Sequence, residues 1–333
     1  MSPNIRDLRP TRRGIAVALI AVLAFALGTS AGARSLNAVV VPAVVALAAG
    51  AIQLARADDP TIDRSKPEPG FPGETRTLTV DIDSTVPCTA TERLADGLSA
   101  VGEPPTEAVG HGGRFSYDVE FERRGGHDIE PTSCRLTDSL GLFRTELDAV
   151  EATTALVYPD IYEVDGAELS ALIRRALGDD RSSFDRLREF APGDTMRDID
   201  WRASAKRPRE EFVVAEYESY SESTHLDIVG ESTLGSADAV AATVASIALH
   251  LHDVGASVTV HVPEGSCISR PGEVGSLLRL LALTGDGWVN DEERAGANVY
   301  VLGEGGTATV TFADHELEFE NVAGAQRSHE VVS

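Results

Sequence analysis

The stretch HLDIVGESTLGSADAVAATVASIALHLHDVGASVTVHV, residues 225–262, decides the fold of the carboxyl-terminal part of the chain. It opens with a short run typical of a buried strand, and Ser236 then stands where a helix would begin. An apolar stripe follows at helical spacing: Val240, Val244, Ile247, Ala248 and Leu251. Gly255 is placed to end that helix, and Ser257 to Val262 form the next strand. The stretch therefore predicts one strand–helix–strand unit.

The same alternation continues toward the carboxyl terminus. Val274 to Leu283 has the spacing of a helix, and Ala297 to Leu302 has that of a third strand. Because helical crossovers join parallel strands, the pattern predicts a doubly wound parallel sheet of the α/β class. A short amphipathic helix ending at Gly178 is predicted ahead of it from Leu169, Leu172, Ile173 and Leu177. The polar residues 321–333 are predicted to be a flexible tail.

Upstream of residue 158 the pattern has the period of strands. The runs Thr77–Ile82 and Phe115–Phe121 alternate apolar and polar residues, with breaks rich in Gly, Pro and Asp between them. We therefore predict a small β-sandwich over residues 74–158. Residues 58–73 are rich in Pro, Gly and charge, which favours an extended linker. The chain as a whole is predicted to be an α+β multidomain protein.

Two uncharged stretches near the amino terminus are each long enough to cross a bilayer. Together they predict a transmembrane hairpin over residues 1–57, with helices at about 14–33 and 35–55. Several arginines flank the hairpin, and only Arg34 lies in its turn: Arg6, Arg9, Arg12, Arg13, Arg56 and Arg64. The positive-inside rule then predicts a multi-pass protein of the cell membrane with both termini in the cytoplasm. The alternative is a cleaved signal peptide, since Ala31-Gly32-Ala33 resembles a cleavage site.

The chain is strongly acidic, with 53 Asp and Glu against 29 Lys and Arg and a net charge of −24. Nucleic acid is excluded as a partner because phosphate neutralisation needs a basic face. The acid surplus and the presence of only two lysines, Lys66 and Lys206, favour a salt-adapted cell. Three scattered cysteines indicate a reduced compartment, although a Cys88–Cys134 bridge is conceivable if the sandwich lies outside the cell.

Between the two predicted domains lies a segment in which charges are dense around one indole. Pro192-Gly193-Asp194 reads as a turn, and Asp194 can cap the element that follows it. Trp201 stands among acidic and arginine side chains, which could form a partly buried ion-pair cluster that locks two elements together. A cluster of this kind is more often structural than functional.

This segment closely resembles the signature of the family called "domain of unknown function 58". The matching residues are Phe190, Gly193, Asp194, Arg197, Ile199, Asp200, Trp201, Ser204 and Ala205. Upstream, Arg123-Arg124-Gly125, Pro131 and the run Thr137–Phe143 resemble the same family, as do the paired apolar segments, so the resemblance covers nearly the whole chain. Lys206 departs from the usual arginine, although Arg207 is placed to substitute for it. Lys206 and Arg207 complete the predicted interaction segment.

The resemblance implies a von Willebrand factor A-like domain within residues 159–320 and a MoxR-type AAA ATPase as partner. In such domains an Asp-x-Ser-x-Ser loop can hold a divalent cation. The aligned residues here are Gly230-Glu231-Ser232-Thr233-Leu234, in which Gly replaces Asp and Leu replaces the second Ser. With two of three oxygen donors gone, we expect no metal site and no cofactor, unless Asp227, Glu231 or Ser232 were recruited irregularly.

The leading hypothesis is a membrane-anchored, non-enzymatic adaptor that works with a cytoplasmic AAA ATPase in an assembly or envelope-related role. His250 and His252 stand two apart on the predicted helix and cannot clamp one metal, so both are expected on a solvated face. No Walker loop, dinucleotide fingerprint, nucleophile elbow or His-Glu-x-x-His motif occurs. The alternatives are an envelope-associated hydrolase with an acidic site at the strand carboxyl ends, and a cation-dependent adhesion domain. The sequence leaves the client and the oligomeric state open.

Overall fold

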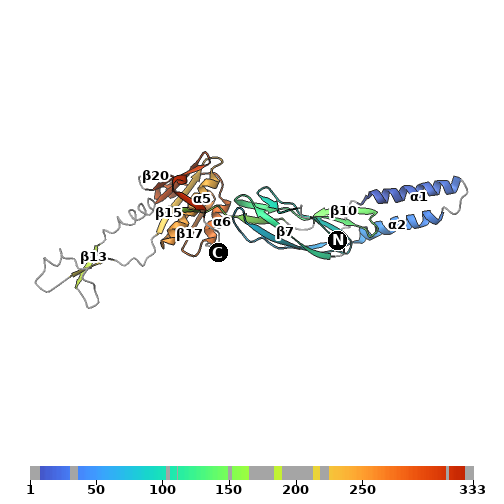
Figure 1. Cartoon of the computed structure of the whole chain (residues 1–333), viewed down its shortest axis with the longest axis horizontal. Coiled ribbons are helices and arrows are strands. Elements are labelled where there is room, and N and C mark those ends of the chain that lie inside the picture. Colours follow the sequence, from blue (N-terminus) through green and yellow to red (C-terminus); the bar gives the residue numbers. More distant parts are fainter. Residues whose placement is uncertain are drawn as a thin grey trace. The chain divides into compact units, whose positions relative to one another are not determined.

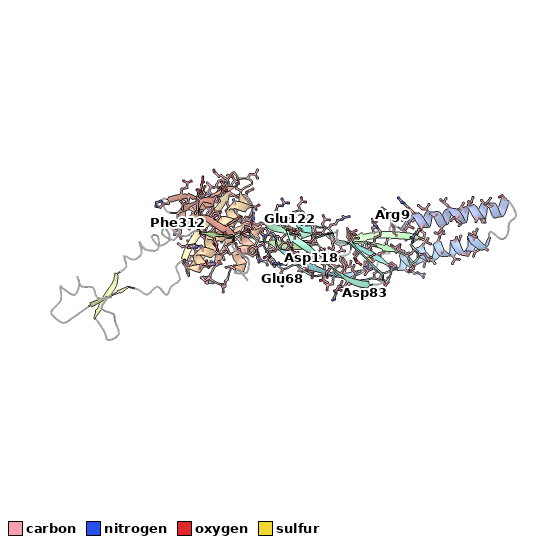
Figure 2. All side chains as sticks on the ribbon, viewed as in Figure 1. Arg9, Glu68, Asp83, Asp118, Glu122 and Phe312 are labelled. Atoms are coloured by element: carbon pink, nitrogen blue, oxygen red, sulfur yellow. The ribbon has the colours of Figure 1, made fainter. Side chains whose placement is uncertain are left out.

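The chain forms two compact units, Met1–Tyr158 and Pro159–Ser333 (Figure 1). The computed structural model describes residues 8–30, 37–102, 106–110, 112–148, 152–164, 184–189, 213–217, 225–312 and 315–326. Side chains are described over most of these ranges (Figure 2). The predicted amphipathic helix at 169–177 lies outside the described residues. Each unit is described by itself.

Two apolar helices, α1 (Arg12–Ser30) and α2 (Asn37–Arg56), open the first unit. Both are long and apolar enough to cross a membrane, as the sequence predicts. Helix α1 begins two residues earlier than expected because Thr11 caps it. The Thr11 hydroxyl accepts a hydrogen bond from the Gly14 N–H at 3.1 Å, and the Thr11 carbonyl accepts one from Ile15 at 2.9 Å.

The rest of the first unit is a β-sandwich. One sheet has the order β1-β10-β9-β4-β6, formed by Arg9–Pro10, Phe143–Asp148, Ser133–Thr137, Cys88–Thr91 and Thr106–Val109. A second has the order β2-β3-β7-β5, formed by Thr61–Arg64, Thr75–Asp83, Gly112–Phe121 and Leu98–Ala100. Two further strands, β8 (Gly125–Ile129) and β11 (Thr153–Val157), pair with each other. The predicted alternation is present, since Leu78, Val80 and Ile82 of β3 are buried.

A buried ion pair joins the sheets of the sandwich. Arg64 on β2 donates to the Glu92 carboxylate at 2.6 Å, and neither side chain is exposed. Thr132 donates to the other oxygen of Glu92 at 2.6 Å, and the Tyr117 hydroxyl donates to the first at 3.3 Å. Burial, together with the adjacent carboxylate, raises the pKa of Tyr117. Each buried charge thus makes several hydrogen bonds that replace its contacts with water.

Residues 58–73 are not the free linker that the sequence predicts. Thr61–Arg64 forms β2 and pairs with the carboxyl-terminal half of β3. Gly70 donates to the carbonyl of Leu156 at 3.3 Å, and the Phe71 ring packs 5.4 Å from that of Tyr158. Composition misled the prediction because Pro and charge are also tolerated on an edge strand and in a loop that packs against a core.

Two cysteines lie inside the sandwich core. Cys88 stands opposite Leu136, and Cys134 stands opposite Ala90, so the two cysteines are diagonal neighbours on one face. Both are free thiols, and their contact lowers the pKa of Cys88 and raises that of Cys134. The two cysteines that the sequence offers for a bridge therefore lie close together.

The helical hairpin is fastened to the sandwich at the turn Asp138–Phe143. The Thr11 hydroxyl donates to the carbonyl of Gly141 at 2.6 Å, and the Thr11 N–H donates to that of Leu142 at 2.8 Å. Gly14 lies so close to the Leu142 carbonyl that any Cβ there would collide with backbone. Only glycine permits this approach of α1 to the turn.

Helix α2 contacts the same turn. The Gln53 side chain donates to the Ser139 hydroxyl at 2.7 Å and accepts from the Ser139 N–H at 3.1 Å. A Cβ at Gly50 would lie 2.9 Å from a carboxylate oxygen of Asp138, which is itself buried. Leu54 is 0% exposed because it belongs to the sandwich core beside Val80 and Leu136. The predicted second transmembrane segment therefore ends inside the soluble domain.

The second unit is built on a six-stranded sheet of order β17-β16-β15-β18-β19-β20. The strands are Gly265–Ser269, Ser257–Val262, His225–Ser232, Val299–Glu304, Thr307–Phe312 and His315–Glu318. The central three, β16, β15 and β18, are parallel, as the sequence predicts. The other three add antiparallel, so the sheet is mixed rather than wholly parallel. They were missed because hairpins need only short turns, which leave little signal in the sequence.

Helices α5 (Ala237–Asp253) and α6 (Gly275–Leu283) contact each other on one face of this sheet, and α7 (Asp291–Gly296) contacts the other. The predicted flexible tail is partly ordered. Helix α8 (Phe319–Val322) is followed by β21 (Ala323–Gln326), which pairs antiparallel with β12 (Tyr162–Val164). The Phe319 ring packs 6.1 Å from that of Tyr162 and holds this pair in place. Residues 327–333 lie outside the described part.

We expect Gly50→Leu to destabilise the first unit. The new side chain would press on the buried Asp138, and overpacking of this kind costs about 1–3 kcal/mol. The measurement is thermal unfolding of the full chain in detergent, followed by circular dichroism. Gly110→Ala is the control because a Cβ there meets nothing within 4 Å. Equal midpoints for both variants would contradict the close approach of α2 to the turn.

Candidate functional site at the carboxyl end of the parallel strands

The segment that the sequence singles out is flanked by a short ladder. Strands β13 (Phe184–Glu189) and β14 (Val213–Tyr217) pair antiparallel, which brings Glu189 opposite Val213. The predicted interaction residues all follow Glu189 and precede Val213, outside the described residues: Phe190, Gly193, Asp194, Arg197, Asp200, Trp201, Ser204, Lys206 and Arg207. The ladder shows only that the two ends of this segment lie side by side.

Within the described part, the carboxyl end of β15 is the place where α/β folds usually bind ligands. It lies at the switch point, since β15 pairs with β16 on one side and with β18 on the other. Gly230 faces α5, where a Cβ would lie 2.9 Å from Val240 and 3.1 Å from Val244. The close seat of α5 therefore excludes the aspartate that the cation loop would need at this position.

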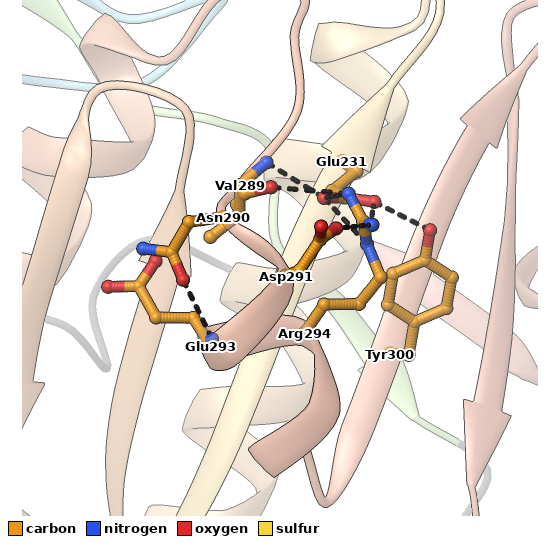
Figure 3. Close-up of polar contacts among 7 residues, drawn as sticks. All are labelled: Glu231, Val289, Asn290, Asp291, Glu293, Arg294 and Tyr300. Atoms are coloured by element: carbon orange, nitrogen blue, oxygen red, sulfur yellow. Dashed lines mark hydrogen bonds and ion pairs between the residues drawn. The ribbon is translucent and has the colours of Figure 1, made fainter.

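Glu231 points to the opposite face and is 0% exposed (Figure 3). One carboxylate oxygen accepts from Nη2 of Arg294 at 2.6 Å and from the Val289 N–H at 2.7 Å. The other accepts from Nε of Arg294 at 3.0 Å and from the Tyr300 hydroxyl at 2.7 Å. The guanidinium forks across the carboxylate, so Glu231 has a full set of donors.

These contacts fix the charge states of the group. Burial alone would raise the pKa of Glu231, but the bonds from Arg294, Tyr300 and Val289 outweigh it and hold that pKa below its usual value. Burial first, and then the bond to Glu231, raise the pKa of Tyr300 to about 12. The same carboxylate raises the pKa of Arg294. Near neutral pH the group has no proton ready to give or accept.

Asp286 occupies the amino terminus of α5. Its carboxylate accepts from the N–H groups of Gly235 at 2.7 Å, Ser236 at 3.1 Å and Ala237 at 2.9 Å, and from the Ser232 hydroxyl at 3.1 Å. The bond from Gly235 is the largest cause that lowers the pKa of Asp286. Ser236 holds the predicted cap position, but its hydroxyl makes no capping bond to its own helix. Asp286 supplies the capping oxygens instead.

The loop 284–290 covers the end of β15. Ser232 and Gly287 exchange backbone hydrogen bonds at 3.0 and 3.1 Å, which fastens the loop to the strand. Trp288 then lies above Arg294, with the guanidinium 6.0 Å from the ring centre, and remains 57% exposed. Leu234, in the turn before α5, is 95% exposed. The outer surface of this edge therefore presents two large apolar side chains among exposed polar ones, which include Asp286 and Asp291.

The residues present do not fit the divalent cation that the sequence resemblance would place here. Leu234 offers no oxygen from its side chain, and the Ser232 hydroxyl donates to Asp286. Glu231 is already held by a guanidinium, which supplies the positive charge in place of a metal. Across the described ranges no group of three or more His, Cys, Asp and Glu is placed to hold a metal ion.

Sequence reasoning named Glu231 and Ser232 but missed their partners Asp286, Arg294 and Tyr300. These partners are 54, 63 and 69 residues away along the chain, and no local spacing marks such pairs. The expectation for His252 was wrong, because its side chain is buried and burial lowers its pKa. A helix with small residues on several sides can be covered on more than one face.

No family model and no curated protein matches the chain. Solved structures are similar to about a third of it. An MSP family member from C. elegans is 12% identical, covers 29% of this chain and 97% of its own length, and has a TM-score of 0.23. The PKD domain of an M14-like peptidase from a Thermoplasmatales archaeon is 19% identical, covers 30% and 98%, and has a TM-score of 0.19. At these scores the likeness carries no argument about this chain.

Acid should weaken the second unit through Glu231 and Asp286. Both pKa values lie below the ordinary 4.5 and 3.8, so their stabilisation is full above those values and is lost as the pH falls through the lower folded values. The measurement is the unfolding midpoint against pH for the full chain and for Glu231→Gln. The variant should show the shallower loss, and identical slopes would contradict the assignment.

Arg294→Gln should destabilise the chain at neutral pH because it leaves a buried carboxylate without its cation. The double variant Glu231→Gln with Arg294→Gln should recover part of the loss, since neither charge then remains. The readout is the midpoint of thermal unfolding, followed by circular dichroism. If the losses of stability in the two single variants simply add in the double variant, the two side chains are independent, and the proposed pairing is wrong.

Proposed function

We propose that the chain is a membrane-anchored, non-enzymatic interaction protein that works with a cytoplasmic MoxR-type AAA ATPase. The observation that carries the non-enzymatic part is the occupation of the β15 edge by Arg294 and Asp286. At the strand end where an α/β fold usually binds a ligand, Arg294 and Asp286 of the chain itself fill the place. The class of the partner, and the assignment to a von Willebrand A-like domain, rest on the resemblance of the Phe190–Ala205 segment.

The anchoring part is supported by the way the hairpin meets the sandwich. Cleavage of a signal peptide near Ala33 would remove α1 and β1, although β1 pairs with β10 and Leu8 packs on the sandwich core. Arg12, Arg13 and Arg56 lie at the helix ends nearest the sandwich. By the positive-inside rule this end faces the cytoplasm, and the sandwich with it.

A hydrolase with an acidic site at this edge is the less favoured reading. Glu231 and Asp286 are acids at the right place, but the pKa of each is lowered rather than raised, and neither can serve as a proton donor near neutral pH. Cation-dependent adhesion is disfavoured by the donor set. The remaining option is that the unit presents a surface to another protein.

The signature segment has a charge suited to that role. Residues 190–207 carry four Arg and Lys side chains and three acidic ones, in a chain whose net charge is −24. A segment that lacks the acid surplus of the rest of the chain repels an acidic partner surface less and favours the encounter with it. Pairing of β13 with β14 brings Glu189 and Val213, which flank the signature, opposite each other.

Trp201→Ala should reduce co-purification of the ATPase. The experiment captures the full chain from native membranes at high salt and identifies bound AAA ATPases by mass spectrometry, with and without ATP. Trp288→Ala is the matched control because Trp288 is the other tryptophan of the chain and lies in the loop 284–290, outside the signature. A folded Trp201→Ala protein that retains the ATPase would overturn the role of the signature.

Titration with Mg²⁺ or Ca²⁺ should release no heat beyond dilution, because the oxygens of Glu231 and Ser232 already bind within the chain. Isothermal calorimetry on the full chain, after treatment with a chelator, makes the measurement. Saturable heat that disappears in Glu231→Gln would restore the adhesion reading.

A further inference from the structure

The hairpin has less free length than its apolar sequence suggests. Helix α2 is in contact with Asp138 from Gly50 onward, and Leu54 is wholly buried in the sandwich core. The part of α2 that is clear of the sandwich, from residue 37 to residue 50, is about 21 Å long at 1.5 Å per residue. Helix α1 is fixed at Gly14, which leaves about 24 Å from Ile15 to Ser30.

These lengths, which leave out residues 31–36 because they lie outside the described part, are shorter than the hydrocarbon layer, which is about 30 Å thick. Either the bilayer thins locally or its surface reaches the part of the sandwich that holds the helices. The part in question is the turn Asp138–Phe143, which is held against both helices. Its chemistry decides between the two possibilities.

The turn suits a membrane interface because its backbone N–H groups are satisfied internally. The Asp138 carboxylate accepts from the N–H groups of Leu140 at 3.0 Å, Leu142 at 2.7 Å and Phe143 at 2.6 Å. The carbonyls of Gly141 and Leu142 accept from Thr11. Such a turn can approach lipid without unpaired N–H groups, which are costly to remove from water.

One large apolar side chain projects from this turn. Leu140 is 55% exposed, although it lies beside two helices that are themselves apolar. Exposed arginines stand at the helix ends that meet the sandwich, with Arg12 and Arg13 at the start of α1 and Arg56 at the end of α2, and Arg13 reaches the turn at Gly141. Arginine binds phosphate through two parallel N–H groups, so these side chains match the phosphodiesters of lipid headgroups.

We propose that the turn Asp138–Phe143 is a third membrane contact, with Leu140 inserted at the boundary of the acyl chains and Arg12, Arg13 and Arg56 bound to headgroup phosphates. The proposal rests on the anchoring proposed above. It makes the sandwich an integral part of the membrane contact, and a bilayer of ordinary thickness is then accommodated by about 21–24 Å of helix plus the turn.

The test places a fluorophore at three positions of the full chain in lipid nanodiscs. Leu140→Cys, Val44→Cys and Val101→Cys are each made with Cys267→Ser, while Cys88 and Cys134 stay buried and unlabelled. Val44 is exposed on α2, and Val101 is exposed after β5, which pairs with the end of β7 far from the hairpin. The quencher is a phospholipid brominated on the acyl carbons nearest the headgroup.

Quenching at positions 44 and 140, but not at 101, is the expected result. Quenching at 44 with none at 140 would overturn the third contact and leave the anchoring intact. Absence of quenching at 44 would overturn both.

The role of the arginines is tested by the amount of lipid phosphorus that stays with the detergent-purified chain. It should fall at least twofold when Arg12, Arg13 and Arg56 are all changed to Gln, and an unchanged value would overturn their role. Arg114→Gln, on β7, is the control.

Discussion

A carboxylate leaves water only where donors replace its hydration, and this constraint organises the molecule. The chain carries 53 acidic residues, and three of those that it buries stand at its structural joints. Asp138 gathers backbone N–H groups where the hairpin meets the sandwich, and Glu92 gathers Arg64, Thr132 and Tyr117 between the sheets. Glu231 gathers Arg294 and Tyr300 at the end of β15. Opening any of these joints would leave a buried carboxylate without its donors, which is costly.

The same constraint bears on function. A carboxylate that has a full set of donors from its own chain is a poor base and a poor ligand, so the edge of the mixed sheet has little left for chemistry. The side chains that remain free of such duties, Leu234 and Trp288, are apolar and exposed. Large exposed apolar groups with a rigid support are typical of protein contacts. Leu234 and Trp288 stand among exposed polar side chains such as Asp286 and Asp291, so this edge would offer a mixed surface to the partner proposed above.

Sequence patterns predicted the elements that depend on local periodicity. The parallel strands, the stripe of α5 and the two apolar helices were found because each repeats a short rule along the chain. Partners far apart in sequence were not found, as with Arg294 and Glu231, because only the fold brings them together. Composition predicted a linker at 58–73 and a flexible tail from 321, but parts of both segments form strands. Such strands pair through backbone groups and need few apolar side chains. The sequence shows glycine where the cation loop would have aspartate, whereas the contact of α5 that leaves no room for a side chain at Gly230 is visible only in the packing.

If the apolar helices span a membrane as proposed, the shared core around Leu54 joins them rigidly to the sandwich. A tether lets a domain turn freely above the bilayer, whereas helices that end inside a domain pass their own tilt on to it. If the bilayer thins or thickens, the helices lean to match it. The sandwich must then lean by the same angle, so lateral stress in the lipid becomes a rotation of the protein surface in the solvent.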